Sequence, residues 1–170
     1  MTIDLLANNM HALPIVTEWL FDEWGRDIPG NSLNSSIERL SSKVSTDSIP
    51  VHLVAISAKE PVGFGALKLR EMDIYPDREH WLGSIYVHPD YRGQGIATSI
   101  IKRAISISES FGVSCLSLQT ERLDGGLYTK LGWEPVEQVH YNRVDVSVME
   151  RRQRTPIHYR ALSRNFNDNY

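Results

Sequence analysis

The sequence lacks several features that would assign a function directly. It has one cysteine, Cys115, in 170 residues, which excludes an intramolecular disulfide and a thiolate metal cluster. Its six histidines are scattered with no pair at ligand spacing, so no metal site is expected. No apolar run approaches the ~20 residues of a membrane span, and residues 1–10 lack the basic-then-apolar layout of a signal peptide. We therefore expect a cytoplasmic protein without membrane contact.

Most of the chain also lacks excess positive charge. Five arginines and one aspartate give residues 151–170 a net charge of +4. Since the whole chain carries −3, residues 1–150 carry −7. An acidic domain is a poor candidate for nucleic acid binding, which requires neutralisation of phosphates. We expect a folded domain over residues 1–150. The basic C-terminal extension, 151–170, is interpreted as solvated or partly ordered chain, with an arm that contacts a partner as the alternative.

The composition and the hydrophobic pattern indicate one folded α/β domain. Apolar residues make up 41% and charged residues 23% of a chain long enough to bury roughly 70% of its unfolded surface. The expected elements are a strand at 3–6, a helix at 13–24, a helix opening at a capping box over 35–38, a hairpin of strands 51–57 and 62–72, a strand at 81–87, a helix from 96 to 112, a strand at 113–119, a short helix at 126–131, and a hairpin over 133–149 that turns near Asn142. The order is β-α-α-β-β-β-α-β-α-β-β. It predicts a mixed sheet with helices on both faces, parallel in the unit 81–119 and mainly antiparallel elsewhere.

A glycine-rich turn, RGQGIA at residues 92–97, joins an apolar strand to an apolar helix. Such a turn needs glycine for positive φ, but free amides at a helix N-terminus and the cation of Arg92 also suit a phosphate. A P-loop is excluded because no lysine follows until Lys102, and the dinucleotide fingerprint is weak because Thr98 stands where its third glycine would be. The pattern Arg/Gln-x-x-Gly-x-Gly/Ala of a pyrophosphate loop matches at every position.

Two stretches together carry a family resemblance. IYVHPDYRGQGIATSII, residues 85–101, resembles the central strand, loop and helix of the GNAT superfamily of acyl-CoA-dependent N-acyltransferases. LYTKLGW, residues 127–133, resembles the second signature of that family, and the element order agrees over about residues 1–150. The resemblance implies a GNAT-like fold and acetyl-CoA as co-substrate. It does not specify the acceptor.

The resemblance also implies a CoA site around the turn. The main chain of the strand would bond the pantetheine arm, and the amides of the loop would hold the pyrophosphate. Gln119, at the end of a later strand, would touch pantetheine or stay a solvated strand terminus. The expected set is Ile85, Tyr86, Val87, Arg92, Gly93, Gln94, Gly95, Ile96, Ala97, Thr98 and Gln119.

For the chemistry, Tyr128 would lie near the thioester sulfur and donate to the departing thiolate, or its ring would only pack beneath the short helix. There is no Ser-His-Asp order, and Cys115 is interpreted as an inert core thiol. Direct transfer is therefore expected rather than an acyl-enzyme. Many family members have a glutamate on the central strand as general base, whereas this sequence has Gly83 and Ser84 there.

The general base must then come from another segment. Asp73 is the first candidate, because that strand end faces the acceptor cleft in the family fold. The other nearby carboxylates are Glu71, Glu23 and Asp27, each of which is commonly a surface charge, and His80 and His88 are weaker candidates. The expected acceptor-binding residues are Glu23, Trp24, Asp27 and Glu71. Carboxylates beside a tryptophan suit a small cationic amine or a peptide amino terminus.

Two functions of different classes follow from these residues. The first is an N-acetyltransferase that uses acetyl-CoA on a primary amine. The second is a CoA-binding regulatory or interaction module that has lost turnover and contacts a partner through the arginine-rich extension. A homodimer is compatible with either function.

Overall fold

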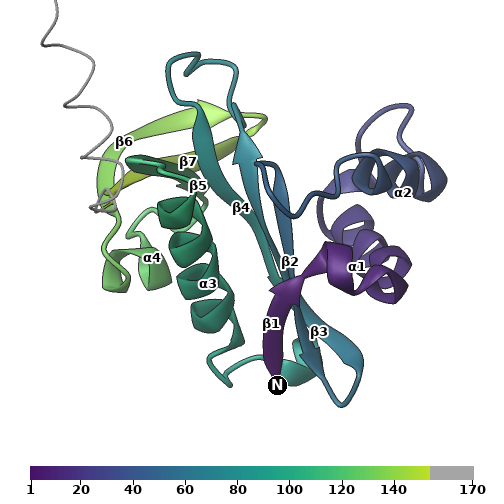
Figure 1. Cartoon of the computed structure of the whole chain (residues 1–170). Coiled ribbons are helices and arrows are strands. Elements are labelled where there is room, and N and C mark those ends of the chain that lie inside the picture. Colours follow the sequence, from purple (N-terminus) through teal and green to yellow (C-terminus); the bar gives the residue numbers. More distant parts are fainter. Residues whose placement is uncertain (154–170) are drawn as a thin grey trace, which may run out of the picture.

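The computed structural model describes residues 1–153, and their centre is a seven-stranded sheet in the order β1-β2-β3-β4-β5-β7-β6 (Figure 1). Residues 154–170, most of the expected basic extension, lie outside this range. The strands are β1 (Thr2–Leu5), β2 (Val51–Ser57), β3 (Glu60–Leu69), β4 (His80–Val87), β5 (Cys115–Thr120), β6 (Glu134–Tyr141) and β7 (Val144–Arg152). Neighbours are antiparallel except β4 and β5, which are parallel. The expected mixed sheet is confirmed.

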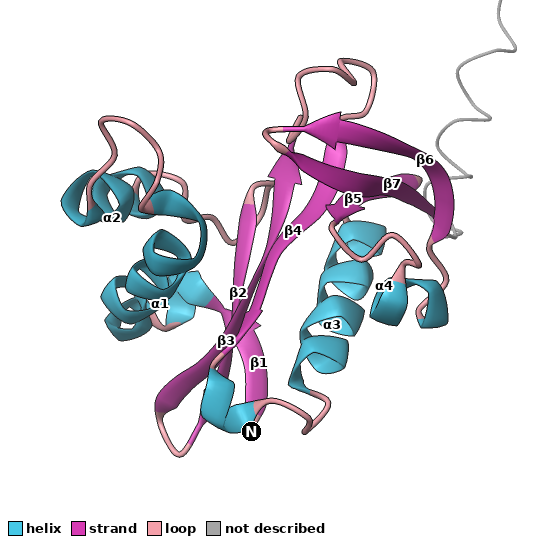
Figure 2. Cartoon of the chain, turned by 180° about the vertical axis from the view of Figure 1, so that it is seen from behind, coloured by secondary structure: helices cyan, strands magenta, loops and turns pink. Residues whose placement is uncertain are grey.

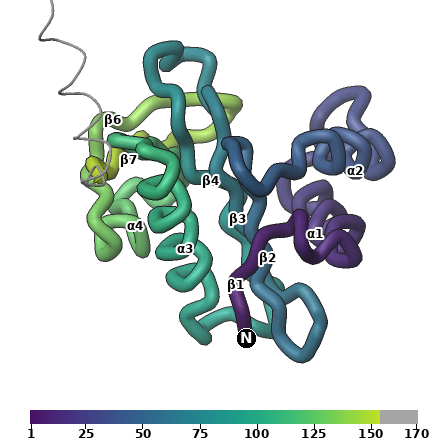
Figure 3. Tube along the Cα trace, in the orientation of Figure 1, coloured from purple at the N-terminus to yellow at the C-terminus, as the bar shows by residue number. Residues whose placement is uncertain are grey.

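Helices cover both faces of the sheet (Figure 2). On one face lie α1 (Leu13–Leu20) and α2 (Leu33–Ser41), and on the other lie α3 (Ile96–Ser110) and α4 (Gly126–Lys130), a division that the chain trace also shows (Figure 3). Three short 3-10 turns occupy Leu6–Asn8, Met10–Ala12 and Pro89–Tyr91. No helix within residues 1–153 is both long enough and apolar enough to cross a bilayer.

Alternation along the strands divides the core into two layers, because successive side chains of a strand point to opposite faces. On β2, Leu53 packs in the cluster under α3, and its neighbour Val54 packs in the cluster under α1. Ile100 of α3 and Phe64 of β3 are fully or almost fully buried in these respective clusters.

Two expected helix boundaries change in the structure. The helix expected over 13–24 ends as an α-helix at Leu20 and continues as one π-helical turn, Phe21–Gly25. The capping box of α2 lies three residues earlier than expected: the Ser32 hydroxyl accepts from the amide of Ser35 at 3.1 Å, and the Ser35 hydroxyl accepts from the amide of Ser32 at 3.0 Å. Both changes affect the segment between α1 and α2, which borders a pocket described below.

The parallel strands β4 and β5 meet at a single register pair, Trp81 with Ser117. Further along β4, Tyr86 and Val87 pair with β3, and a bulge interrupts that ladder near Ser84, whose φ is +51°. One edge of the C-terminal half of β4 is thus unpaired within the described residues. Its main-chain groups are available to a ligand.

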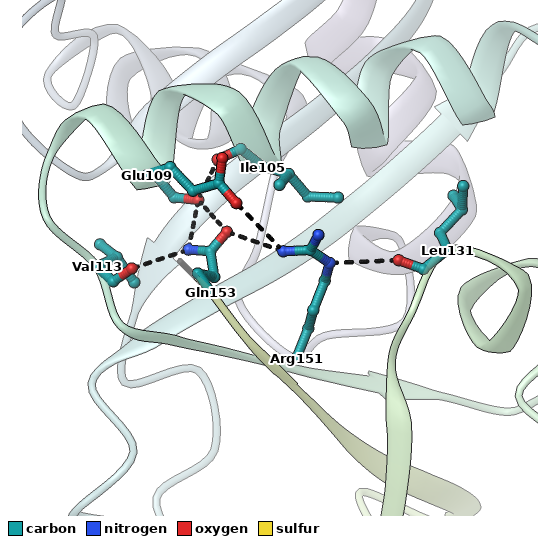
Figure 4. Close-up of polar contacts among 7 residues, drawn as sticks. Ile105, Glu109, Val113, Leu131, Arg151 and Gln153 are labelled. Atoms are coloured by element: carbon teal, nitrogen blue, oxygen red, sulfur yellow. Dashed lines mark hydrogen bonds and ion pairs between the residues drawn. The ribbon is translucent and has the colours of Figure 1, made fainter. Parts of the chain in front are cut away.

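The C-terminal end of β7 is bound to α3 and to the segment after α4 (Figure 4). Arg151 donates from Nε to the Leu131 carbonyl at 3.3 Å and from Nη1 to the Glu109 carboxylate at 3.5 Å. Gln153 donates from Nε2 to the Val113 carbonyl at 3.1 Å. The folded domain therefore includes residues 151–153, three residues past the boundary expected at 150.

Candidate active site

The glycine turn forms the N-terminus of α3, with Gly95 as its N-cap. Gly93 and Gly95 both have φ of +76°, a conformation that favours glycine, and a Cβ on either would meet no heavy atom within 4 Å. The turn thus uses glycine for its backbone conformation and also leaves open space above its amides. Arg92 donates from Nε to the Val87 carbonyl at 3.0 Å, which fastens the turn to the end of β4.

A cleft of about 400 Å³ lies between this turn, the end of β4 and the π-helical turn. We call it the loop cleft. It is lined by Glu23, Trp24, Ile85, Tyr86, Val87, Tyr91, Arg92, Gly93, Gly95, Ile96, Ala97, Thr98 and Leu127. Every residue expected to bind CoA lines the cleft except Gln94 and Gln119. The expected acceptor residues Glu23 and Trp24 also lie here.

A second pocket of about 730 Å³ lies between the sheet and the helices α1 and α2. We call it the α1–α2 pocket. Its walls combine apolar and aromatic side chains with a few polar ones, and they consist of Thr17, Leu20, Phe21, Trp24, Gly25, Ile28, Asn31, Ser36, Arg39, Leu40, Lys43, Pro50, His52, Phe64, Ala66, Lys68, Leu69, Glu71 and Ser84. Trp24 lines both cavities, is 47% exposed, and meets the Tyr86 ring edge-on at 6.4 Å. Asp27 lines neither cavity.

Glu71 follows β3 and places its carboxylate against β4. Its Oε1 accepts from Lys68 Nζ and from Gln119 Nε2, both at 3.3 Å. Its Oε2 is buried and has no hydrogen-bond partner within residues 1–153. A Cβ built on Gly83 would lie 2.5 Å from this Oε2, so the carboxylate occupies the space into which a side chain at that position of β4 would project. Glu71, in the loop between β3 and β4, thus places a carboxylate beside the position of β4 at which the sequence has glycine.

Tyr128 lies on α4, with its ring edge-on to Trp133 at a centroid distance of 6.0 Å. It lines neither cavity, although its neighbour Leu127 lines the loop cleft. Burial, and secondly the negative charge of Glu71, raise the pKa of Tyr128 to about 12. The phenol is therefore protonated at neutral pH, and it lies within the electrostatic influence of the Glu71 carboxylate.

Asp73 lies apart from this group. It is exposed, its Oδ1 accepts from the Tyr141 hydroxyl at 3.1 Å, and it lines neither cavity. The role of Asp73 as general base stays a prediction, but the structure brings Glu71 and not Asp73 to the pocket. The sequence signal for Glu71 was its position after β3 together with the glycine at position 83.

The chain matches proteins of known family over most of its length. The sequence model of the Acetyltransferase (GNAT) family matches residues 13–133. The peptidyl-lysine N-acetyltransferase YjaB of Salmonella typhimurium is 25% identical over 108 residues, which are 64% of this chain and 66% of the length of that relative.

Solved structures of acetyltransferases share the fold. An aminoglycoside 6'-acetyltransferase type Ii superposes with a TM-score of 0.69 at 20% identity over 92% of this chain and 100% of that chain. An aminoglycoside 6'-N-acetyltransferase complexed with coenzyme A gives 0.70 at 17% identity over 92% and 99%. The ribosomal-protein-S18-alanine N-acetyltransferase from Escherichia coli gives 0.63 at 19% identity over 89% and 92%. With the family match over residues 13–133, the chain belongs to the GNAT acetyltransferase family and is an acyltransferase.

Proposed function

We propose that the protein transfers an acetyl group from acetyl-CoA directly to a primary amine of a small molecule or a peptide amino terminus, without an acyl-enzyme. The observation that carries the proposal is the Oε2 of Glu71, which lies against Gly83 beside the α1–α2 pocket, is buried, and has no hydrogen-bond partner among residues 1–153. A carboxylate oxygen in this state lacks only a donor, and the ammonium of an acceptor supplies one. Cys115 lines neither cavity, which supports direct transfer.

The loop cleft fits CoA on the chemistry of its lining. The first-turn amides of α3 and the guanidinium of Arg92 suit a pyrophosphate, and the open space above Gly93 and Gly95 permits its approach to the main chain. The unpaired edge of Ile85–Val87 suits the amides of a pantetheine arm. A protein of the same fold is complexed with coenzyme A. Bound in this way, acetyl-CoA would supply the acetyl group as a thioester.

Glu71 acts as the base in this proposal. Lys68 and Gln119 donate to Oε1, which leaves Oε2 as the oxygen that would accept from the acceptor amine. The acceptor ammonium first releases one proton to solvent, because only the neutral nitrogen has an electron pair for attack. After this nitrogen bonds to the thioester carbon it becomes strongly acidic, and Oε2 receives its second proton.

Tyr128 acts as a hydrogen-bond donor to the departing sulfur. With a pKa of about 12, full transfer of its proton to a thiolate whose conjugate acid has a pKa of roughly 8.5 is uphill by about 5 kcal/mol. Donation without full transfer avoids that cost. Protonation of Glu71 removes one of the two causes of the raised pKa, so Tyr128 becomes a stronger donor at the stage when the sulfur leaves.

A pair of isosteric variants tests the base. Glu71→Gln keeps the shape and removes the proton acceptor, so kcat/KM for an amine should fall by roughly 10²- to 10⁴-fold, the usual range for general base catalysis. Asp73→Asn is the matched control and should stay within about twofold, since Asp73 is exposed and outside both cavities. Both are measured by release of free CoA thiol in a screen of amines and peptides.

A third variant tests the geometry. Gly83→Ala places a methyl group at 2.5 Å from Glu71 Oε2, so the carboxylate must move, and kcat should fall while the acetyl-CoA KM changes little. A loss of rate in Asp73→Asn with none in Glu71→Gln would transfer the role to Asp73. Absence of thiol release with every amine would support the non-catalytic CoA-binding module instead.

A further inference from the structure

The α1–α2 pocket carries more positive than negative side chains. Its lining holds three cations, Arg39, Lys43 and Lys68, against one carboxylate, Glu71. Lys68 is paired with Glu71 at 3.3 Å. Neither Arg39 nor Lys43 forms an ion pair within residues 1–153. Arg39 is held in place by donating from Nη2 to Asn31 Oδ1 and Ser36 Oγ, both at 3.0 Å. Two cations of the pocket are therefore free to meet an anion.

His52 supplies a second, independent observation. It lies on β2, lines the pocket, is only 7% exposed, and stacks on the Phe64 ring at 5.9 Å. Its Nδ1 is buried without a hydrogen-bond partner within residues 1–153, whereas buried polar groups are nearly always paired. Burial, with the charges of Lys68 and Lys43, lowers the pKa of His52 to about 4. The ring is thus neutral, lies close to both lysines, and has one nitrogen free for a ligand.

The charge of the pocket is opposite to the one that a cationic acceptor needs. The carboxylates expected to attract such an acceptor, Glu23 and Asp27, are not among its lining residues. A polycationic amine would meet Arg39 and Lys43 with no carboxylate beyond Glu71 to offset them.

The sheet register sets the length of the acceptor. His52 pairs with Ala66 on β3, and Ala66 pairs with Gly83 on β4, so these residues form a row across one face. With strands about 4.8 Å apart, His52 and the Glu71 carboxylate over Gly83 are separated by about 10 Å. A hydrogen bond of about 3 Å at each end leaves at least about 4 Å between the two groups of the ligand, and more where the bonds point out of the sheet into the pocket. An extended dipeptide spans about 7 Å, whereas the amine and carboxylate of one amino acid are about 3 Å apart.

We propose that the pocket binds a peptide amino terminus with its amine at Glu71 and a carboxylate one residue further along, paired with Lys43 and Arg39 beside the free Nδ1 of His52. The inference rests on the proposed function and narrows its acceptor. The carboxylate comes either from the C-terminus of a free dipeptide or from an acidic side chain at the second position of a longer chain.

The test compares substrates that differ only in the carboxylate. One arm pairs Ala-Phe with Ala-Phe amide, and the other pairs Ala-Asp-Phe amide with Ala-Asn-Phe amide. L-phenylalanine is the control for spacing. With the full chain, kcat/KM from CoA thiol release should be at least about tenfold higher for the acid in one arm, as for a hydrogen bond to a charged group. L-phenylalanine should be used more weakly than the preferred peptide.

Variants of Lys43 and Arg39 test whether these cations cause the preference for peptide acids over amides. Lys43→Gln should reduce the ratio of acid to amide by about two- to fivefold, since Lys43 is exposed, and the double variant with Arg39→Gln should reduce it further. Lys59→Gln is the matched control. Lys59 is an exposed lysine in the turn between β2 and β3, outside both cavities, and the ratio should not change.

The outcomes separate this inference from the proposed function. If the amides are used as well as the acids in both arms, the inference is wrong and the acetyltransferase remains. If no amine releases CoA thiol, the proposed function fails, and the same peptide pairs are then measured by calorimetry with CoA present. If a peptide acid binds more tightly than its amide and the Lys43→Gln, Arg39→Gln double variant loses this difference, the proposed carboxylate site is upheld. Equal binding of acid and amide, or no binding of either, overturns it.

Discussion

Tyr128→Phe removes one hydroxyl and keeps the ring that packs against Trp133 at 6.0 Å. Burial and the charge of Glu71 raise the pKa of Tyr128 from 10.0 to about 12, so the phenol stays protonated throughout the assay range. Because proton transfer to the leaving thiolate is uphill by about 5 kcal/mol, the hydroxyl is proposed to act as a hydrogen-bond donor. We expect kcat to fall by roughly 10- to 10²-fold, the low end of general acid effects, with little change in acetyl-CoA KM.

The assay is CoA thiol release at saturating acceptor, with a single-turnover measurement to show that chemistry limits the rate. In the wild type, ionisation of Tyr128 should not lower kcat below about pH 11. Tyr75→Phe is the matched control, because its hydroxyl donates to Glu137 at 2.8 Å outside both cavities, and its rate should be unchanged. If Tyr128→Phe turns over like the wild type with chemistry limiting, Tyr128 is a packing residue and the reasoning is refuted.

Three further sets of variants test the glycine turn at residues 92–97, His52 and the C-terminal boundary. Gly95→Glu should weaken CoA binding by more than about tenfold, since its carboxylate would meet the pyrophosphate. Gly95→Ala is the control for backbone strain alone. Unchanged CoA affinity of Gly95→Glu in calorimetry would contradict the phosphate site. His52 is neutral in the fold with a pKa of about 4, while the unfolded chain binds its proton below about pH 6.5, so stability falls as pH drops from 6.5 to 4. Urea unfolding should show a loss of about 2 kcal/mol between pH 7.5 and 5 that is absent in His52→Phe. A chain that ends at Gln153 should keep its CoA affinity within about twofold, whereas one that ends at residue 150 loses the bonds of Gln153 to Ser108 and Val113 and should unfold about 2 kcal/mol more easily in urea.

The sequence determined the elements whose signals are local. The strand expected at 51–57 has those bounds in the structure, because its apolar run is closed by a two-residue turn, Ala58 and Lys59, both with positive φ. The last hairpin turns at Asn142 and Arg143 in the same conformation. The start of α3 at Ile96 follows from the glycine turn before it. A strand period, a tight turn and a helix N-terminus each depend on neighbours within a few residues.

Local signals were ambiguous where the sequence offers two similar choices. The serine-rich segment before α2 allows a capping box that begins at Ser32 or at Ser35, and in the structure it begins at Ser32. The charge count assigned Arg151 to a solvated extension, because composition does not show that it reaches Glu109 on α3, 42 residues away in the sequence.

Only the tertiary structure led to Glu71 as the proposed base. From sequence, Asp73 and Glu71 are nearly equivalent, two residues apart in one polar loop. The fold distinguishes them, because Lys68 and Gln119, the latter 48 residues further along the chain, hold Glu71 over a glycine of β4, while Asp73 points to the Tyr141 hydroxyl. The charge of the α1–α2 pocket depends in the same way on which side chains of α2, β2 and β3 converge there. Residue types near one another in sequence determine the local backbone, but the burial and pairing of a charged group depend on strands brought together from distant parts of the chain.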